Sequence, residues 1–196
     1  ELIYEPQKAR FPLKFGAVVM DQVALCKVRV VVETRAGAVG EGWGAMFLAD
    51  FWSWPTASIE HSVKQQVMQR TVEGYARLVA DYGEPAHPVD VFWSLEDELH
   101  RLSDEVSREV GTPEPQPFLG ALVCASPVDA ALHDAFGVAN GVDVYKAYGP
   151  EFMGDLSHLL GNEFKDRYIA DYLRAEYKQE IEVFHLVGGL DKLTRG

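Results

Sequence analysis

The chain has 196 residues, of which 47% are hydrophobic, 11% aromatic and 24% charged. This composition is typical of a globular protein and excludes a disordered, collagenous or low-complexity chain. Lysine and arginine number 18 against 30 aspartates and glutamates, so the formal net charge is −12. A nucleic-acid partner or an anionic membrane would require a basic surface, so the charge argues against both, while it leaves a divalent cation open.

The expected location of the protein in the cell follows from three sequence features: membrane-span length, signal-peptide layout and cysteine usage. The sequence has no apolar run of the roughly 18 residues that a membrane span needs, and Glu1 to Arg10 does not have the layout of a secretory signal. Cys26 and Cys124 stand far apart in apolar surroundings, which suggests neither a disulfide framework nor a zinc site. We therefore expect a cytoplasmic protein.

The first 50 residues are β-like. An apolar segment runs from Phe11 to Val19, and Val23 to Thr34 is rich in β-branched residues that alternate between two faces. Gly37 then indicates a hairpin, after which Ala38 to Phe47 returns as a strand interrupted by glycines. These segments predict a three-stranded antiparallel meander.

Helical periodicity replaces this alternation after Pro55. Apolar residues spaced by three and four predict helices over about 59–83, 90–111 and 118–139. Pro127 lies inside the third segment, where either a new helix begins at Ser126 or one kinked helix continues. We expect Leu132 to be buried between this helix and the meander. The predicted fold class is α+β, a meander followed by a helical bundle.

The C-terminal part follows a different pattern. Leu156 to Tyr177 is polar and aromatic with weak helical spacing. Ile181 to Val187 alternates in the manner of a short strand and is followed by Gly188 and Gly189. Such a strand requires a partner elsewhere.

Several chemically suggestive groups are better explained by structure. Glu96 and His100 share a helix face that invites a metal, but they alternate with the apolar stripe and fit its solvated side. His133 and Asp134 are expected to anchor packing rather than to catalyse. The glycines between Gly37 and Gly44 lie in a hairpin, whereas a phosphate loop needs a helix after its glycines.

One element is unusual for a surface. Met46 to Pro55 holds four aromatic residues between a strand and a helix, and such residues are costly to leave in water. The segment either folds back on the core or forms a lid over an apolar or ring-bearing ligand or partner.

Three motifs resemble one known family. They are the opening Arg10 to Gly16, the hairpin VRVVVETRAGAVGEGWG (Val28–Gly44), and PVDAALHDAFGVANGVDVYKAYG (Pro127–Gly149). In this order they resemble the capping domain of the enolase superfamily, in its mandelate racemase and muconate lactonizing enzyme branch. The resemblance covers roughly residues 8 to 149, although Tyr148 and Gly149 replace the family's double glycine at its end.

The resemblance implies a two-part enzyme. Residues 1–149 would be the capping domain, and a (β/α)₈ barrel would carry the acidic Mg²⁺ ligands and the bases that remove a proton next to a carboxylate. Racemase, dehydratase and cycloisomerase reactions are all open. A barrel needs about 250 residues, so 150–196 would be a linker with at most the first barrel strand. No catalytic or metal-binding residue is expected in this chain, which would be inactive alone.

The resemblance also implies two loops that close over a small carboxylate substrate at the barrel mouth. One covers about residues 15–22 and the other about residues 46–54, so the second coincides with the aromatic segment. The candidate capping residues are Phe15, Val19, Met20, Asp21, Phe47, Phe51, Trp52 and Trp54. A homo-oligomer is expected as well.

Two other classes of protein remain open. The second hypothesis is a stand-alone α+β binding module whose aromatic segment docks a partner, without catalysis. The chain would also fit a fragment of a pseudo-enzyme with a structural role. The reading frame beyond Gly196 separates these possibilities.

Overall fold

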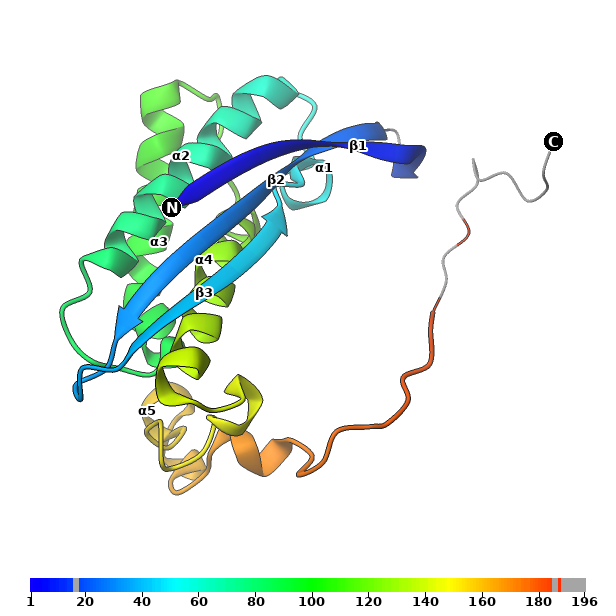
Figure 1. Ribbon diagram of the computed structural model, residues 1–196. Coiled ribbons are helices and arrows are strands. Elements are labelled where there is room, and N and C mark those ends of the chain that lie inside the picture. Colours follow the sequence, from blue (N-terminus) through cyan, green and yellow to red (C-terminus); the bar gives the residue numbers. More distant parts are fainter. Residues whose placement is uncertain (16–17, 185–186, 188–196) are drawn as a thin grey trace.

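The computed structural model describes residues 1–15, 18–184 and 187. In these residues an antiparallel sheet is followed by helices that cover one of its faces, which confirms the predicted α+β class (Figure 1). The strands are β1 (Leu2–Phe15), β2 (Val18–Glu33) and β3 (Val39–Phe47). The helices are α1 (Asp50–Ser53), α2 (His61–Ala80), α3 (Pro88–Val110), α4 (Phe118–Asn140) and α5 (Ser157–Leu160), with short 3₁₀ turns at η1 (Val144–Lys146), η2 (Asn162–Phe164) and η3 (Ile169–Tyr172).

The sheet has the order β1-β2-β3, as a meander requires. Its first strand begins at Leu2, nine residues earlier than Phe11, where the sequence predicted it. Only the start of β1 has helices behind it, where the hydroxyl of Tyr4 donates to the Gln69 carbonyl of α2 at 3.2 Å. Farther along, the β1–β2 hairpin extends beyond the helices (Figure 1). Without a covered face, that stretch carries no clear alternation of apolar and polar residues.

The glycines of β3 allow a close approach of α4. A Cβ on Gly42 would lie 2.0 Å from the backbone nitrogen of Ala135, and one on Gly44 would lie 2.1 Å from the carbonyl oxygen of Pro127. Gly40 meets the backbone of Ala139 in the same way. The glycines at positions 40, 42 and 44 therefore serve the packing of the helix on the strand.

Helix α4 is continuous, so the alternative in which a new helix begins at Ser126 is wrong. Pro127 lies inside the helix and is fully buried. The expectation for Leu132 is also wrong, because its side chain is only half-buried. The approach of α4 to the β3 glycines leaves room for Ala131 and Ala135 but not for leucine, and Leu132 is turned to the side of the helix.

An acidic side chain fastens the free edge of β3 to this helix. Asp134 Oδ2 accepts a hydrogen bond from the backbone N–H of Trp43 at 2.8 Å. The anchoring role predicted for Asp134 is thereby confirmed. An edge N–H that would otherwise face water is paired within the chain.

Residues 142–172 fold back against the rest of the chain. Ala147, Met153 and Leu156 are buried there, and the Leu156 N–H donates to the carbonyl of Arg167 at 2.7 Å. The domain boundary placed after Gly149 stays a prediction, because this segment lies against α3 and α4 without showing where a second domain begins.

The strand predicted over Ile181–Val187 is wrong for the residues that the structure describes. Ile181 to Phe184 has no regular secondary structure, and the side chains of Val183 and Phe184 are 89% and 91% exposed. Residues 185 and 186 lie outside the described part. The segment has strand-forming residues, but the described part of the chain provides no neighbouring strand for it to bond with.

None of the described helices combines the length and the apolar character that crossing a membrane would require.

Candidate functional site

A pocket of about 690 Å³ lies where β2 begins, next to α1 and the start of α2. Its lining is mostly apolar, with a polar wall on the α2 side. The lining residues are Val19, Met20, Asp21, Gln22, Val23, Asp50, Phe51, Trp52, Pro55, Thr56, Ala57, His61 and Lys64.

The pocket brings together residues from both predicted capping segments. Val19, Met20 and Asp21 line it from one side, and Phe51 and Trp52 line it from the other. These residues are about 30 positions apart in the sequence, and they meet because β3 returns alongside β2 and delivers α1 to the start of that strand.

Two of the predicted capping residues are placed differently, and the side chain of a third is not described. Phe47 is 47% exposed and does not line the pocket, and the side chain of Phe15 lies outside the described part. Trp54 is only 1% exposed, and its ring belongs to a core cluster with Ile59, Val67 and Val106. Trp54 is therefore a core residue, because the turn after α1 directs its large apolar ring inward.

The described part of the first capping segment is strand rather than loop. Val19, Met20 and Asp21 belong to β2, where Val19 pairs with Lys14 and Met20 with Leu13. Between these pairs and Lys8 the register of β1 shifts. The shift bends the hairpin, and a bulge of this kind redirects side chains at a sheet edge.

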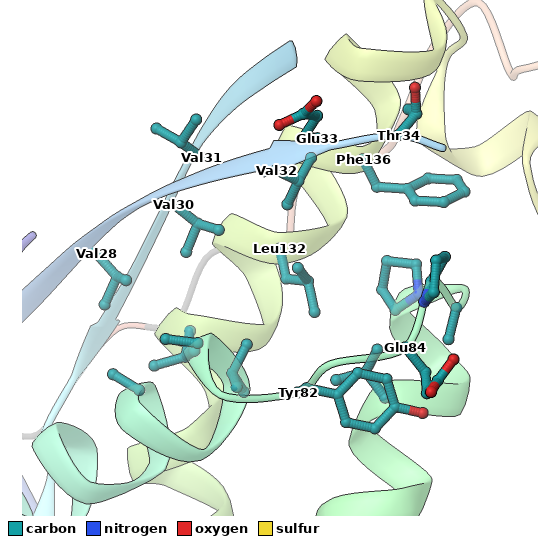
Figure 2. A pocket seen from close by; sticks show the side chains of 18 of the residues that line it. Val28, Val30, Val31, Val32, Glu33, Thr34, Tyr82, Glu84, Leu132 and Phe136 are labelled. Carbon is teal, nitrogen blue, oxygen red and sulfur yellow. The ribbon is translucent and has the colours of Figure 1, made fainter. Parts of the chain in front are cut away.

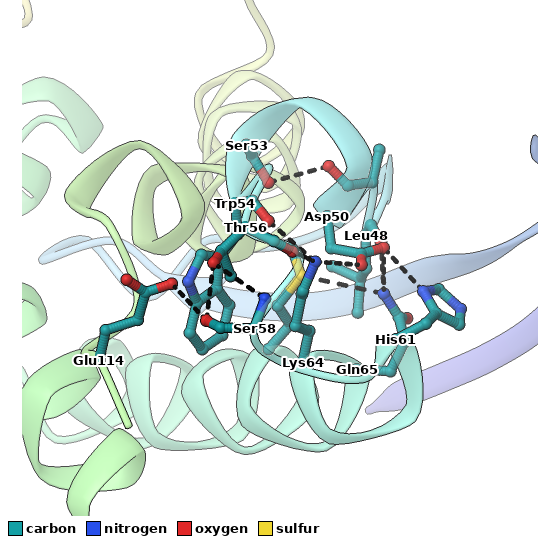
Figure 3. A network of polar contacts seen from close by, with 12 residues as sticks. Leu48, Asp50, Ser53, Trp54, Thr56, Ser58, His61, Lys64, Gln65 and Glu114 are labelled. Atoms are coloured by element: carbon teal, nitrogen blue, oxygen red, sulfur yellow. Dashed lines mark hydrogen bonds and ion pairs between the residues drawn. The ribbon is translucent and has the colours of Figure 1, made fainter. Parts of the chain in front are cut away.

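A network of polar side chains around a buried carboxylate forms the α2 side of the pocket (Figure 3). The carboxylate of Asp50, 4% exposed, accepts from Gln65 Nε2 at 3.3 Å and lies 2.9 Å from His61 Nδ1. Its second oxygen lies 3.6 Å from Lys64 Nζ. Three partners from one helix thus compensate the burial of the carboxylate, which would otherwise be very costly.

Lys64 holds the segment after α1 in place. Its ammonium donates to the carbonyl oxygens of Trp54 at 3.1 Å and Thr56 at 2.8 Å (Figure 3). Gln65 holds the preceding turn, because its amide donates to the Leu48 carbonyl at 2.8 Å. Side chains of α2 therefore hold the backbone on both sides of α1, which carries Phe51 and Trp52.

The sequence reasoning missed Asp50, His61 and Lys64 as parts of the site. The available signal was Lys64, which is in phase with the buried residues Met68, Thr71 and Tyr75 of α2 and interrupts an otherwise buried face. A buried lysine requires an anionic or carbonyl partner, and Asp50 is the acidic residue in the aromatic segment.

The arrangement is suited to contact rather than to reaction. Met20, Phe51, Trp52 and Pro55 offer apolar and ring surfaces, while the buried carboxylate is already engaged by three partners. Asp21 is exposed at the same pocket and free to face a polar group of a ligand.

The alternative metal site is not supported by geometry. His100 stacks on Phe118 with ring centroids 5.0 Å apart, and it lies near Asp104 rather than beside Glu96. Within residues 1–15, 18–184 and 187, no group of three or more histidines, cysteines, aspartates or glutamates is arranged to hold a metal ion.

A separate set of titratable groups lies at the start of α3. The ring of His87, 2% exposed, is packed 5.0 Å from Phe136 and 5.4 Å from Tyr148. Its Nδ1 accepts the Val89 N–H as a helix cap at 3.2 Å, while Nε2 has no partner among the described residues. Burial, aided by the charge of His133, lowers the pKa of His87 to about 4.

Because the pKa of His87 is low in the folded chain, we expect the fold to lose stability in acid. The unfolded chain takes up the proton near pH 6.5 while the folded chain does so near pH 4, so stability is lost as the pH falls through this window. The loss amounts to about 3 kcal/mol. His87→Asn keeps a side chain that can cap the helix but removes the titrating group. Urea unfolding at pH 7 and pH 4 should show that the free energy of unfolding falls by about 3 kcal/mol less in this variant than in the wild type. Equal losses in both proteins would contradict the placement of His87.

No family model matches this chain, and no curated protein matches it. Among solved structures, the chain is similar to a mandelate racemase/muconate lactonizing enzyme-like protein from Rubrobacter xylanophilus, with 20% sequence identity and a TM-score of 0.40. The alignment covers 76% of this chain and 32% of that one, so this chain spans about a third of the length of that structure.

Proposed function

We propose that this chain is the substrate-capping domain of an enolase-superfamily enzyme that removes a proton next to a carboxylate. The proposal rests on the three sequence motifs that resemble the family. The observation that carries it is the pocket in which Met20 and Asp21 meet Phe51 and Trp52, because two segments expected to close over one substrate do converge there.

In this proposal the chain selects and encloses a small carboxylate substrate, and does not transform it. The apolar pair Phe51 and Trp52 would cover the body of the substrate and exclude water, which strengthens electrostatic interactions inside a closed site. Asp21 would contact a polar substituent. The Asp50–Lys64 network would keep the aromatic wall in position.

Bound Mg²⁺ would stabilise the enediolate that proton removal forms. The described residues offer no cluster fit to hold this ion, so its ligands would belong to a barrel domain outside them. Isomerase or lyase activity, an assembly of identical subunits and a cytoplasmic location complete the proposal.

The test is a substitution in the protein that carries both domains. In Phe51→Ala/Trp52→Ala, kcat/KM should fall at least tenfold, and the ranking among carboxylate substrates of different size should change, because the cover over the substrate is lost. Mg²⁺ affinity should change little and the fold should be retained, since both side chains are only half-buried. The unfolding midpoint should fall to some extent, because Trp52 also packs against the core.

The matched control is Trp43→Ala, which removes a tryptophan 48% exposed on the opposite side of the sheet. It should leave both kcat/KM and substrate ranking unchanged. If the double variant keeps the wild-type ranking, or if Trp43→Ala alters it equally, the capping role is wrong. A stand-alone binding module would show no turnover in any of these proteins.

A further inference from the structure

A second cavity, of about 650 Å³, lies between β2, the end of α2, the start of α3 and α4 (Figure 2). It shares no lining residue with the pocket beside α1. Its size falls in the range of about 300–1,000 Å³ that is typical of small-molecule sites.

The deepest walls of this cavity are apolar, and the lining becomes more polar and more exposed from the floor outward. Val28, Val91 and Val128 are buried at its floor, with exposed fractions of 1%, 6% and 1%. Leu132 and Phe136 line it farther out and are only half-buried. Protein interiors are normally close-packed, so this cavity offers apolar surface that the described chain leaves uncovered.

The mouth of the cavity carries an excess of negative charge. Tyr82 and Glu84 lie across the cavity from Val32 and Phe136 (Figure 2). Glu151 also lines it, and the ion pairs found among the described residues involve neither Glu84 nor Glu151.

The basic groups at this end do not cancel that charge. Arg29 is paired with Glu41 at 2.5 Å, on the outer face of the sheet. Arg35 lines the cavity with an exposed guanidinium, against the carboxylates of Glu84 and Glu151, while Glu33 points to the outer face of the sheet (Figure 2). The N-terminal ammonium of Glu1, which also lines the cavity, donates to the Arg29 carbonyl at 3.0 Å and is offset by the carboxylate of the same residue. The whole chain adds to this potential with its net charge of −12.

We propose that this cavity binds an amphiphilic organic cation, with its apolar body along Val30, Val32 and Leu132 and its ammonium group at the mouth near Glu84 and Glu151. The rings of Tyr82 and Phe136 face the same space and attract a cation through their π-electrons. An anionic amphiphile of equal length gains the same apolar contact but meets carboxylates at the mouth. The chemistry of the cavity therefore discriminates by the sign of the head group.

The test compares three probes that share an eight-carbon chain: octyltrimethylammonium, octan-1-ol and octanoate, each titrated calorimetrically into the 196-residue chain. Octyltrimethylammonium should bind saturably at one site and tightest, with octanoate weakest. Leu132→Trp, which fills the cavity, should weaken binding of the cation more than tenfold.

A second variant addresses the head group without touching the core. Glu84→Gln replaces an exposed carboxylate with an amide of nearly the same shape, so the fold should be retained. It should weaken binding of octyltrimethylammonium about threefold and leave that of octan-1-ol unchanged. Phe51→Ala, in the other pocket, should have no effect on any probe.

Three results would overturn the proposal. They are no saturable binding of the cation, equal affinity for octanoate, and binding that Leu132→Trp and Glu84→Gln both leave intact.

Sedimentation of the chain with and without the probe tests whether a second copy of the chain covers the cavity. If the chain is a dimer whose dissociation exposes the binding site, a second copy covers the cavity and the proposal is wrong. Because the two pockets share no residue, failure here leaves the capping role untouched.

Discussion

Substituting Gly42 with alanine should cost more than about 4 kcal/mol of the free energy of unfolding, which places it among the most damaging single substitutions. The added Cβ would lie 2.0 Å from the Ala135 nitrogen and 2.5 Å from the Ala131 carbonyl oxygen. Both are backbone atoms of α4, so relief requires the helix to move away from the sheet and to open the core between them. Urea unfolding measures the loss.

The control for this substitution is Gly83→Ala. An added Cβ at Gly83 meets nothing within 4 Å, and the backbone there is not in the left-handed region. The free energy of unfolding should therefore change by no more than about 0.5 kcal/mol. Similar losses for the two variants would show that α4 does not lie against β3 at the distance described.

Replacing Asp50 with alanine should cost about 3–5 kcal/mol, because it leaves the charge of Lys64 buried without its anionic partner. Lys64 is 6% exposed; besides its ion pair with Asp50, its ammonium donates hydrogen bonds to the carbonyl oxygens of Trp54 and Thr56. Denaturant unfolding near neutral pH gives the loss directly.

Two further variants isolate the cause. The double variant Asp50→Ala/Lys64→Met should lose less free energy of unfolding than the two single variants lose together, since it leaves no unpaired buried charge. Glu98→Ala breaks an exposed pair with Arg101 on α3 and should change stability by no more than about 0.5 kcal/mol. Strict additivity of the two network variants would show that Asp50 and Lys64 do not act as a pair.

The fold was predictable wherever one face of an element is covered. Alternation in Val23–Thr34 and the spacing that ends at Gly111 both led to real elements, β2 and α3, and Gly111 adopts the left-handed conformation that ends α3. The first residues of β1 were missed because Leu2 and Tyr4, which pack against the core, are followed by the mostly polar run from Glu5 to Arg10, which shows no apolar alternation. Ile181–Val187 was mistaken for a strand because alternation alone does not provide a bonding partner.

The candidate site was predictable in part. Its apolar residues, Phe51 and Trp52, were found because exposed aromatic residues are expensive and therefore conspicuous in a sequence. Trp54 could not be separated from them, since a four-residue helix followed by a turn has no periodicity from which a buried face can be inferred. Helical spacing marks Lys64 as a residue on the buried face of α2 that needs a partner. That this partner is Asp50 depends on tertiary contact between α1 and α2, which spacing alone does not show.

The most direct measurement for the capping role is the reading frame that follows the codon for Gly196 in the gene. The proposal predicts about 200 further residues in which strands alternate with helices, with acidic residues at the ends of successive strands. Such a sequence would supply the barrel that the pocket of Met20, Phe51 and Trp52 is proposed to cover. A stop codon directly after Gly196 would contradict the capping role and would favour a stand-alone binding module.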